Sequence, residues 1–180
     1  MANDQDRSGF SLLELLIAVS ILMVVAVVAI PNVTAAISHA RLRASMTSFS
    51  GVLQNTRMLA VKQNATMSTR VAVKPNGLIA YVKTATDSSA LSSWDAQVQL
   101  QAPVSKVTAP SGPGAPTALD TAVLGFTPET GDSSFNSRGM PCTYSGGNCV
   151  SHGFLYYFKE ARPRNESGWA AVSISGLVSI

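Results

Sequence analysis

The chain has 180 residues, of which 46% are hydrophobic and 13% are charged, and its formal net charge is +3. This length allows one globular domain beside a membrane anchor. The net charge is too small to indicate a nucleic-acid-binding protein by itself, and the sequence shows no internal repeat.

An apolar run from Leu12 to Ile30 is the first predicted element. Seventeen of its 19 residues are apolar, and a helix needs about 20 residues to span the hydrocarbon core of a bilayer. Glu14 places a carboxylate inside this run, which raises the free energy of membrane insertion by on the order of 2.5 to 3.5 kcal/mol. We therefore expect Glu14 to have a charged partner or a functional role. The alternative is a secretory signal peptide cut near Val27-Val28-Ala29. Such a peptide has a positive leader, whereas residues 1–8 hold two aspartates and one arginine.

The beginning of the chain resembles the class III signal of type IV prepilins and type II secretion pseudopilins. The resemblance rests on Gly9, the contiguous Phe10-Ser11-Leu12-Leu13-Glu14, the apolar run and Pro31. It implies that residues 1–9 are a leader, that a prepilin peptidase cuts between Gly9 and Phe10, and that the new Phe10 amine is N-methylated. Glu14 would then neutralise such an amine within a bundle of helices and so fix the register between subunits.

The helical pattern continues beyond the apolar run. Arg41, Arg43, Arg57 and Lys62 lie off a stripe of residues that recur mostly at steps of three and four. The predicted stripe consists of Val33, Ala36, Ile37, Ala40, Ala44, Phe49, Val52, Leu53, Thr56 and Ala60. We expect one helix over 10–64, transmembrane over about 12–30 and amphipathic over 31–64, with a kink at Pro31 and a stop at Gln63-Asn64.

A β-rich domain is predicted over 65–180. The clearest hairpin joins strands over 69–73 and 78–83 through a turn in which Asn76-Gly77 supplies positive φ. The chain from 84 to 118 is predicted to be a long connection that contains one or two edge strands. Residues 110–116 of it are predicted to form a loop. The other expected strands are 97–100, 104–107, 123–126, 153–158, 170–174 and 177–180. The expected fold class is α+β, in which the long helix packs on a C-terminal antiparallel sheet as in pilins.

Four further segments narrow the resemblance. They are Leu42-Arg43-Ala44, the run from Leu53 to Asn64, the run from Phe135 to Gly139, and the run from Val172 to Gly176. These segments are similar to the H-type pseudopilins of type II secretion and to the T- and U-type minor pilins. The resemblance implies a non-enzymatic minor subunit without a cofactor, in a secretion pseudopilus or, as the alternative, a type IV pilus.

The same resemblance implies a location and partners. The chain would cross the bacterial inner membrane once, with its C-terminal domain in the periplasm. Its partners would be other pseudopilins or pilins through the N-terminal helix, the prepilin peptidase, an inner-membrane assembly platform and membrane lipid.

Cys142 and Cys149 are the two cysteines of the chain. In an oxidising compartment the flexible loop between them, which contains Gly146-Gly147, can close through a disulfide that stabilises the fold by about 2 to 3 kcal/mol. Two free thiols are the alternative. A metal site with His152 is not expected, because a fourth ligand is missing.

A basic cluster formed by Lys159, Arg162 and Arg164 follows the aromatic run Tyr156-Tyr157-Phe158. Such a cluster can bind DNA through phosphate contacts and stacking, but we favour an aromatic strand followed by a solvated turn. T-type minor pilins that take up DNA use a basic segment after the last glycine, and Gly176 to Ile180 holds no cation. The sequence shows no catalytic constellation, so we expect no enzyme.

Overall fold

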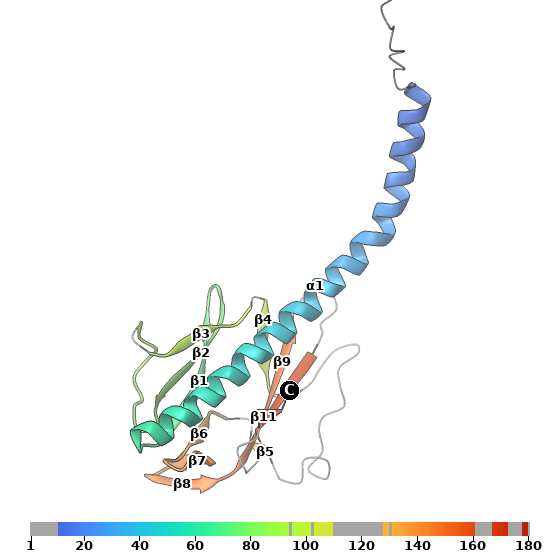
Figure 1. The fold of residues 1–180 in the computed structure, drawn as a ribbon. Coiled ribbons are helices and arrows are strands. Elements are labelled where there is room, and N and C mark those ends of the chain that lie inside the picture. Colours follow the sequence, from blue (N-terminus) through green and yellow to red (C-terminus); the bar gives the residue numbers. More distant parts are fainter. Residues whose placement is uncertain are drawn as a thin grey trace, which may run out of the picture. The chain divides into compact units, whose positions relative to one another are not determined.

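The structure is a computed structural model, and it describes residues 11–93, 95–101, 103–109, 128–129, 131–160, 167–172 and 178–179 (Figure 1). The chain divides into two units, Met1–Ile37 and Ser38–Ile180. The described elements are α1 (Leu12–Gln63), β1 (Met67–Lys74), β2 (Gly77–Thr84), β3 (Gln97–Gln99), β4 (Val104–Val107), β5 (Pro128–Glu129), β6 (Ser133–Phe135), β7 (Pro141–Ser145), β8 (Asn148–Ser151), β9 (Gly153–Glu160), β10 (Ser167–Val172) and β11 (Val178–Ser179).

The long helix α1 is confirmed and runs without interruption through Pro31. Its second part buries one face at steps of three and four residues, as an amphipathic helix does. The buried residues of that face are Leu42, Ser45, Phe49, Val52, Leu53, Thr56 and Ala60. The predicted stripe is therefore right from Phe49 onward, whereas its first five members are exposed: Val33, Ala36, Ile37, Ala40 and Ala44. Three of these five are alanines, which are small enough to lie on either face, so their spacing gave a weak signal.

The end of α1 is set by Asn64, which has a left-handed backbone conformation with φ 48°. The amide of Ala65 donates to the carbonyl of Ala60 at 3.2 Å, and the amide of Asn64 donates to that of Val61 at 3.3 Å. These two bonds form a Schellman motif, which satisfies carbonyls that the helix leaves without partners. Asparagine tolerates this conformation better than most residues, as the sequence predicted.

Two sheets follow the helix, where the sequence predicted one antiparallel sheet. The first has the order β3-β2-β1-β6-β7-β8, and the second has the order β11-β10-β9-β4 with β5 beside β9. All described pairs are antiparallel except β5 and β9, which are parallel. The fold class is thus confirmed as a long helix packed on antiparallel strands, while the number of sheets differs from the prediction.

The β1–β2 hairpin is confirmed, and its register pairs Lys74 with Gly77. Among the described residues of the turn, Gly77 has positive φ (121°) and Asn76 does not, so the prediction for Asn76 was wrong. The register places Pro75 and Asn76 at the centre of the turn, and the fixed negative φ of Pro75 excludes the hairpin turn in which both central residues have positive φ.

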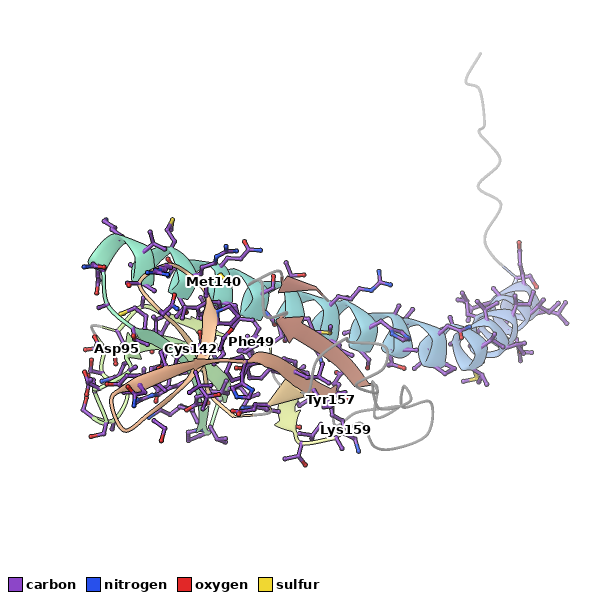
Figure 2. All side chains as sticks on the ribbon, turned by 90° about the horizontal axis from the view of Figure 1, so that it is seen from below. Phe49, Asp95, Met140, Cys142, Tyr157 and Lys159 are labelled. Atoms are coloured by element: carbon purple, nitrogen blue, oxygen red, sulfur yellow. A yellow bond between two sulfur atoms is a disulfide. The ribbon has the colours of Figure 1, made fainter. Side chains whose placement is uncertain are left out.

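The core is built where α1 packs on β9. The ring of Phe49 meets those of Tyr156 and Phe158 edge-to-face, with centroid distances of 4.8 and 5.0 Å. Since side chains alternate along a strand, Tyr157 and Lys159 lie on the opposite face of β9, and Figure 2 shows Lys159 directed away from α1. The aromatic strand predicted at 153–158 is therefore confirmed as one side of the core.

Candidate functional site

The first part of α1, from Leu12 to Ile30, is the candidate anchor. Its side chains are exposed in the chain by itself, and a window of α1 has a mean hydropathy of 2.9. By length and composition this helix can cross a membrane. A helix that is apolar on every side needs lipid or other helices around it.

Glu14 lies in the first turn of α1 and is exposed. A carboxylate is favoured there because the helix dipole places a partial positive charge at the N-terminus. Glu14 is the one ionisable side chain between Leu12 and Ile30. Gly9 and Phe10, the expected cleavage and methylation positions, lie outside the described residues, so these roles remain predictions.

Polar side chains in this part of α1 and just beyond it are satisfied by the helix itself. The Ser20 hydroxyl donates to the Leu16 carbonyl at 2.8 Å, and the Asn32 amide donates to the Val28 carbonyl at 3.3 Å. The Thr34 hydroxyl donates to the carbonyl of Pro31 at 2.9 Å. Such local bonds let polar residues occupy a lipid-exposed helix at lower cost. Pro31 has no amide hydrogen to donate to Val27, and the kink expected there stays a prediction.

The basic cluster is described in part. Lys159 lies near the end of β9, and its carbonyl accepts a hydrogen bond from Ser105. Arg162 and Arg164 lie outside the described residues. The arrangement of the three cations therefore lies outside the described residues, and DNA binding stays a prediction.

The two cysteines form a disulfide between Cys142 and Cys149. The loop that the disulfide closes is the β7–β8 hairpin, in which Gly146 and Gly147 have φ values of 57° and 87°. These glycines form the tight turn, since positive φ at both central positions suits a two-residue hairpin loop. The disulfide is therefore confirmed, whereas the sequence did not indicate β7 and β8, because both strands are short and carry few of the apolar residues that mark a strand.

His152 lies next to this hairpin and faces an acidic residue of β5. Its Nδ1 is 3.7 Å from Oε1 of Glu129, and Oε2 of Glu129 accepts a 2.6 Å hydrogen bond from Thr143. In the described part of the chain no three histidine, cysteine or acidic side chains come close enough to hold a metal ion.

A buried lysine cluster is a feature that the sequence analysis missed. The Lys83 ammonium is buried at the end of β2 and donates to Asp87 at 3.2 Å and to Ser89 at 2.5 Å, and it lies 3.4 Å from Asp95. Burial opposes the charge of Lys83, but the two aspartates raise its pKa above the usual value. The spacing of Lys83 and Asp87 was the available signal, and it is weak outside a helix.

This cluster holds the segment between β2 and β3. The amide of Ser89 donates to Asp87 at 2.8 Å, and that of Ser92 donates to Asp95 at 2.7 Å. The backbone bond from Ser89 is the main reason that the pKa of Asp87 falls to about 2. The bond from Ser92 likewise lowers the pKa of Asp95. One buried cation thus organises a long loop through two anions.

Comparison with known proteins adds one finding. Residues 4–30 match the family model described as the prokaryotic N-terminal methylation motif, which is the class III prepilin signal. Neither the curated proteins nor the solved structures contain a significant match.

Proposed function

We propose that this chain, whose N-terminal methylation motif is that of the type IV pilin-like proteins, is a membrane-anchored minor pseudopilin of a type II secretion system, of the H type. The observation that carries the proposal is the contiguous motif from Gly9 to Glu14, directly followed by an apolar helix whose sides are exposed. The subunit is structural and acts by assembly, without catalysis or a cofactor.

The chemistry of assembly follows from this motif. Cleavage after Gly9 creates a positive amine on Phe10, and N-methylation leaves that charge in place. In a bundle of such helices the amine of one subunit pairs with Glu14 of a neighbour, where the low dielectric strengthens the attraction. The exposed apolar faces exchange lipid for the faces of neighbouring helices during assembly.

Residues in the second unit support a minor subunit of the H type or of the T and U types. Two of the segments that resemble this group contact each other, because Gly139 packs against Arg57 and Val61 of α1. A T- or U-type minor pilin shares these segments and is the alternative. In both cases the C-terminal domain lies in the periplasm, and the prepilin peptidase and the inner-membrane assembly platform act on the subunit.

Processing is tested by Gly9→Ala in a strain that contains the prepilin peptidase. We expect the variant to remain uncut, because the peptidase must fit a residue without a side chain beside the scissile bond. Intact mass of the membrane-extracted protein reports the cut, and Gly51→Ala is the control that should be processed normally. A mature wild-type chain that begins anywhere but Phe10 would contradict the proposal.

Deletion of the gene separates the two kinds of filament. If the chain is a minor pseudopilin, deletion of its gene should abolish protein secretion and leave surface pili in place. Reintroduction of the intact gene should then restore secretion. Loss of pili with normal secretion would instead favour the T- or U-type minor pilin. The identity of the neighbouring genes provides an independent check.

A further inference from the structure

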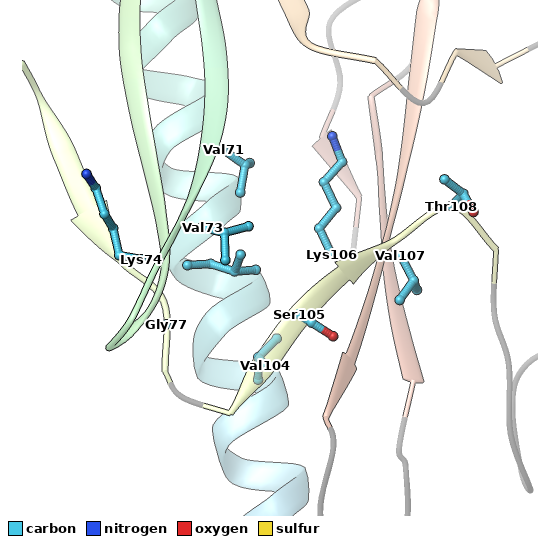
Figure 3. A pocket seen from close by; sticks show the side chains of 10 residues that line it. Val71, Val73, Lys74, Gly77, Val104, Ser105, Lys106, Val107 and Thr108 are labelled. Atoms are coloured by element: carbon cyan, nitrogen blue, oxygen red, sulfur yellow. The ribbon is translucent and has the colours of Figure 1, made fainter. Parts of the chain in front are cut away.

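A groove of about 400 Å³ lies between the β1–β2 hairpin and β4. Figure 3 shows Val71 and Val73 of β1 on one side of the groove and Lys106 of β4 on the other. Leu78 and Val104 also line it. Val73 is 82% exposed, which is unusual for a valine in a paired strand. The groove therefore presents apolar surface that the described chain leaves uncovered.

The groove borders an edge of β4, which is the last strand of the second sheet. The second sheet ends with β4, whose register with β9 pairs Val104 with Glu160 and Val107 with Tyr157. Among the described strands, none pairs with the other edge of β4. An unpaired edge offers backbone donors and acceptors in the geometry that an added strand needs.

The charge of the groove selects the partner. Its lining residues include Lys74 and Lys106 and no acidic residue. The Lys106 ammonium lies 4.9 Å from the ring centroid of Tyr156, so it is held beside an aromatic face. Burial lowers the pKa of Lys106, an effect that Asp132 partly offsets. An anion from outside would relieve this poorly solvated cation.

We propose that the free edge of β4 binds an extended segment of another protein, with an acidic side chain next to Lys106 and apolar side chains against Val71 and Val73. This contact is independent of the N-terminal helix. A second copy of the chain fits less well, because its described edge strands β3, β8 and β11 contain no acidic residue, and Glu129 of the two-residue strand β5 already accepts a hydrogen bond from Thr143 and lies beside His152.

The test uses the full-length chain in detergent micelles and three synthetic peptides. The first alternates valine and threonine and ends in glutamate, the second replaces glutamate with lysine, and the third carries a central proline. Amide hydrogen exchange followed by mass spectrometry should show slower exchange in β4 with the first peptide. We expect roughly tenfold weaker binding of the second peptide, since a charge-assisted bond is lost, and no protection by the third.

Variants locate the binding surface. Val73→Asp and Lys106→Gln should each weaken binding of the acidic peptide by roughly tenfold or more. Val150→Asp is the matched control, because Val150 is exposed on the edge strand β8, and it should bind normally. Far-ultraviolet circular dichroism should be the same for all variants.

Three results would overturn the proposal. One is equal binding by the wild type and by Val73→Asp. Another is protection of the β4 amides in the free chain equal to that of β9, since the edge would then be covered by the chain itself. The third is protection of β4 that rises with protein concentration without peptide, which would make a second copy the occupant.

Discussion

Nη1 of Arg41 lies 3.9 Å from Oε1 of Glu160, so an ion pair connects α1 to the end of β9. The two partners differ in environment: the Arg41 side chain is 48% exposed, whereas that of Glu160 is 1% exposed. Neither carboxylate oxygen of Glu160 has a hydrogen-bond partner in the described chain. Because a buried carboxylate is costly without a cation, Arg41 compensates for a charge that the core tolerates poorly.

Arg41→Ala should lower the free energy of unfolding by about 1 to 3 kcal/mol. This is less than for a fully buried pair, because water screens the exposed arginine. The double variant Arg41→Ala with Glu160→Leu should recover most of the loss, since no buried charge then remains. Denaturant unfolding in micelles measures both. Arg43→Ala is the control, because Arg43 is exposed, and it should change stability by less than about 0.5 kcal/mol. No recovery in the double variant would show that Glu160 is not the source of the effect.

The Lys83 cluster predicts acid sensitivity. The pKa of Asp87 is lowered from 3.8 to about 2 in the folded chain. Its contribution to stability is therefore fully present when the pH is above the pKa that Asp87 has in the unfolded chain. That contribution is lost as the pH falls from about 4 through 2. We therefore expect the melting temperature to fall over this range, and Asp87→Asn to reduce the fall. Asp132→Asn is a control that leaves the Lys83 cluster intact and should keep the fall.

Alkaline pH should act on the same cluster through its cation. The pKa of Lys83 is raised above 10.5, so its contribution is complete below that value and is lost as the pH rises through the folded pKa. Lys83→Met should remove this alkaline loss. An unchanged alkaline profile in that variant would exclude Lys83 as its cause.

Gly139 and Gly51 should respond in opposite directions to alanine. Gly139 has φ 75°, and a Cβ there would lie 3.1 Å from Cγ2 of Val61 and 3.2 Å from Cγ of Arg57. We expect Gly139→Ala to cost about 1 to 3 kcal/mol through backbone strain and overpacking. Gly51 lies within α1, and a Cβ added there would meet no other atom within 4 Å, so Gly51→Ala should stabilise the chain by about 0.5 to 1 kcal/mol. Equal effects at both positions would contradict the packing of 136–140 against α1.

Glu14→Ala separates anchoring from assembly. The variant should still insert, because removal of the charge lowers the cost of insertion by roughly 2 to 3 kcal/mol, and cleavage at Gly9 should continue. Assembly should fail, because the Phe10 amine would remain buried without its counter-charge at a cost of about 3 to 5 kcal/mol. That cost corresponds to roughly a hundredfold or greater loss of incorporation into the filament.

Crosslinking to partner pilins measures the incorporation of Glu14→Ala, and membrane fractionation controls for insertion. Ser20→Ala is a matched control in the same part of the helix, because the Ser20 hydroxyl bonds within its own helix. Normal assembly of the Glu14 variant would leave Glu14 without the role proposed for it.

The sequence by itself determined the features that depend on neighbouring residues. The apolar run, the end of α1 at Asn64 and the β1–β2 hairpin follow from local composition and backbone preference, and the structure contains each of them. The N-terminal motif is equally local, which is why a family model of residues 4–30 detects it. Such signals survive because they do not depend on which distant segment packs against them.

Tertiary structure alone decided which residues from distant parts of the chain pair with each other. Burial of Glu160 against Arg41, and of Lys83 among two aspartates, depends on contacts that no local pattern encodes. The groove beside β4 likewise exists because strands from different sheets lie side by side. Periodicity reports that a residue can be buried or paired, whereas the partner is chosen by long-range packing, where small differences in free energy select one arrangement.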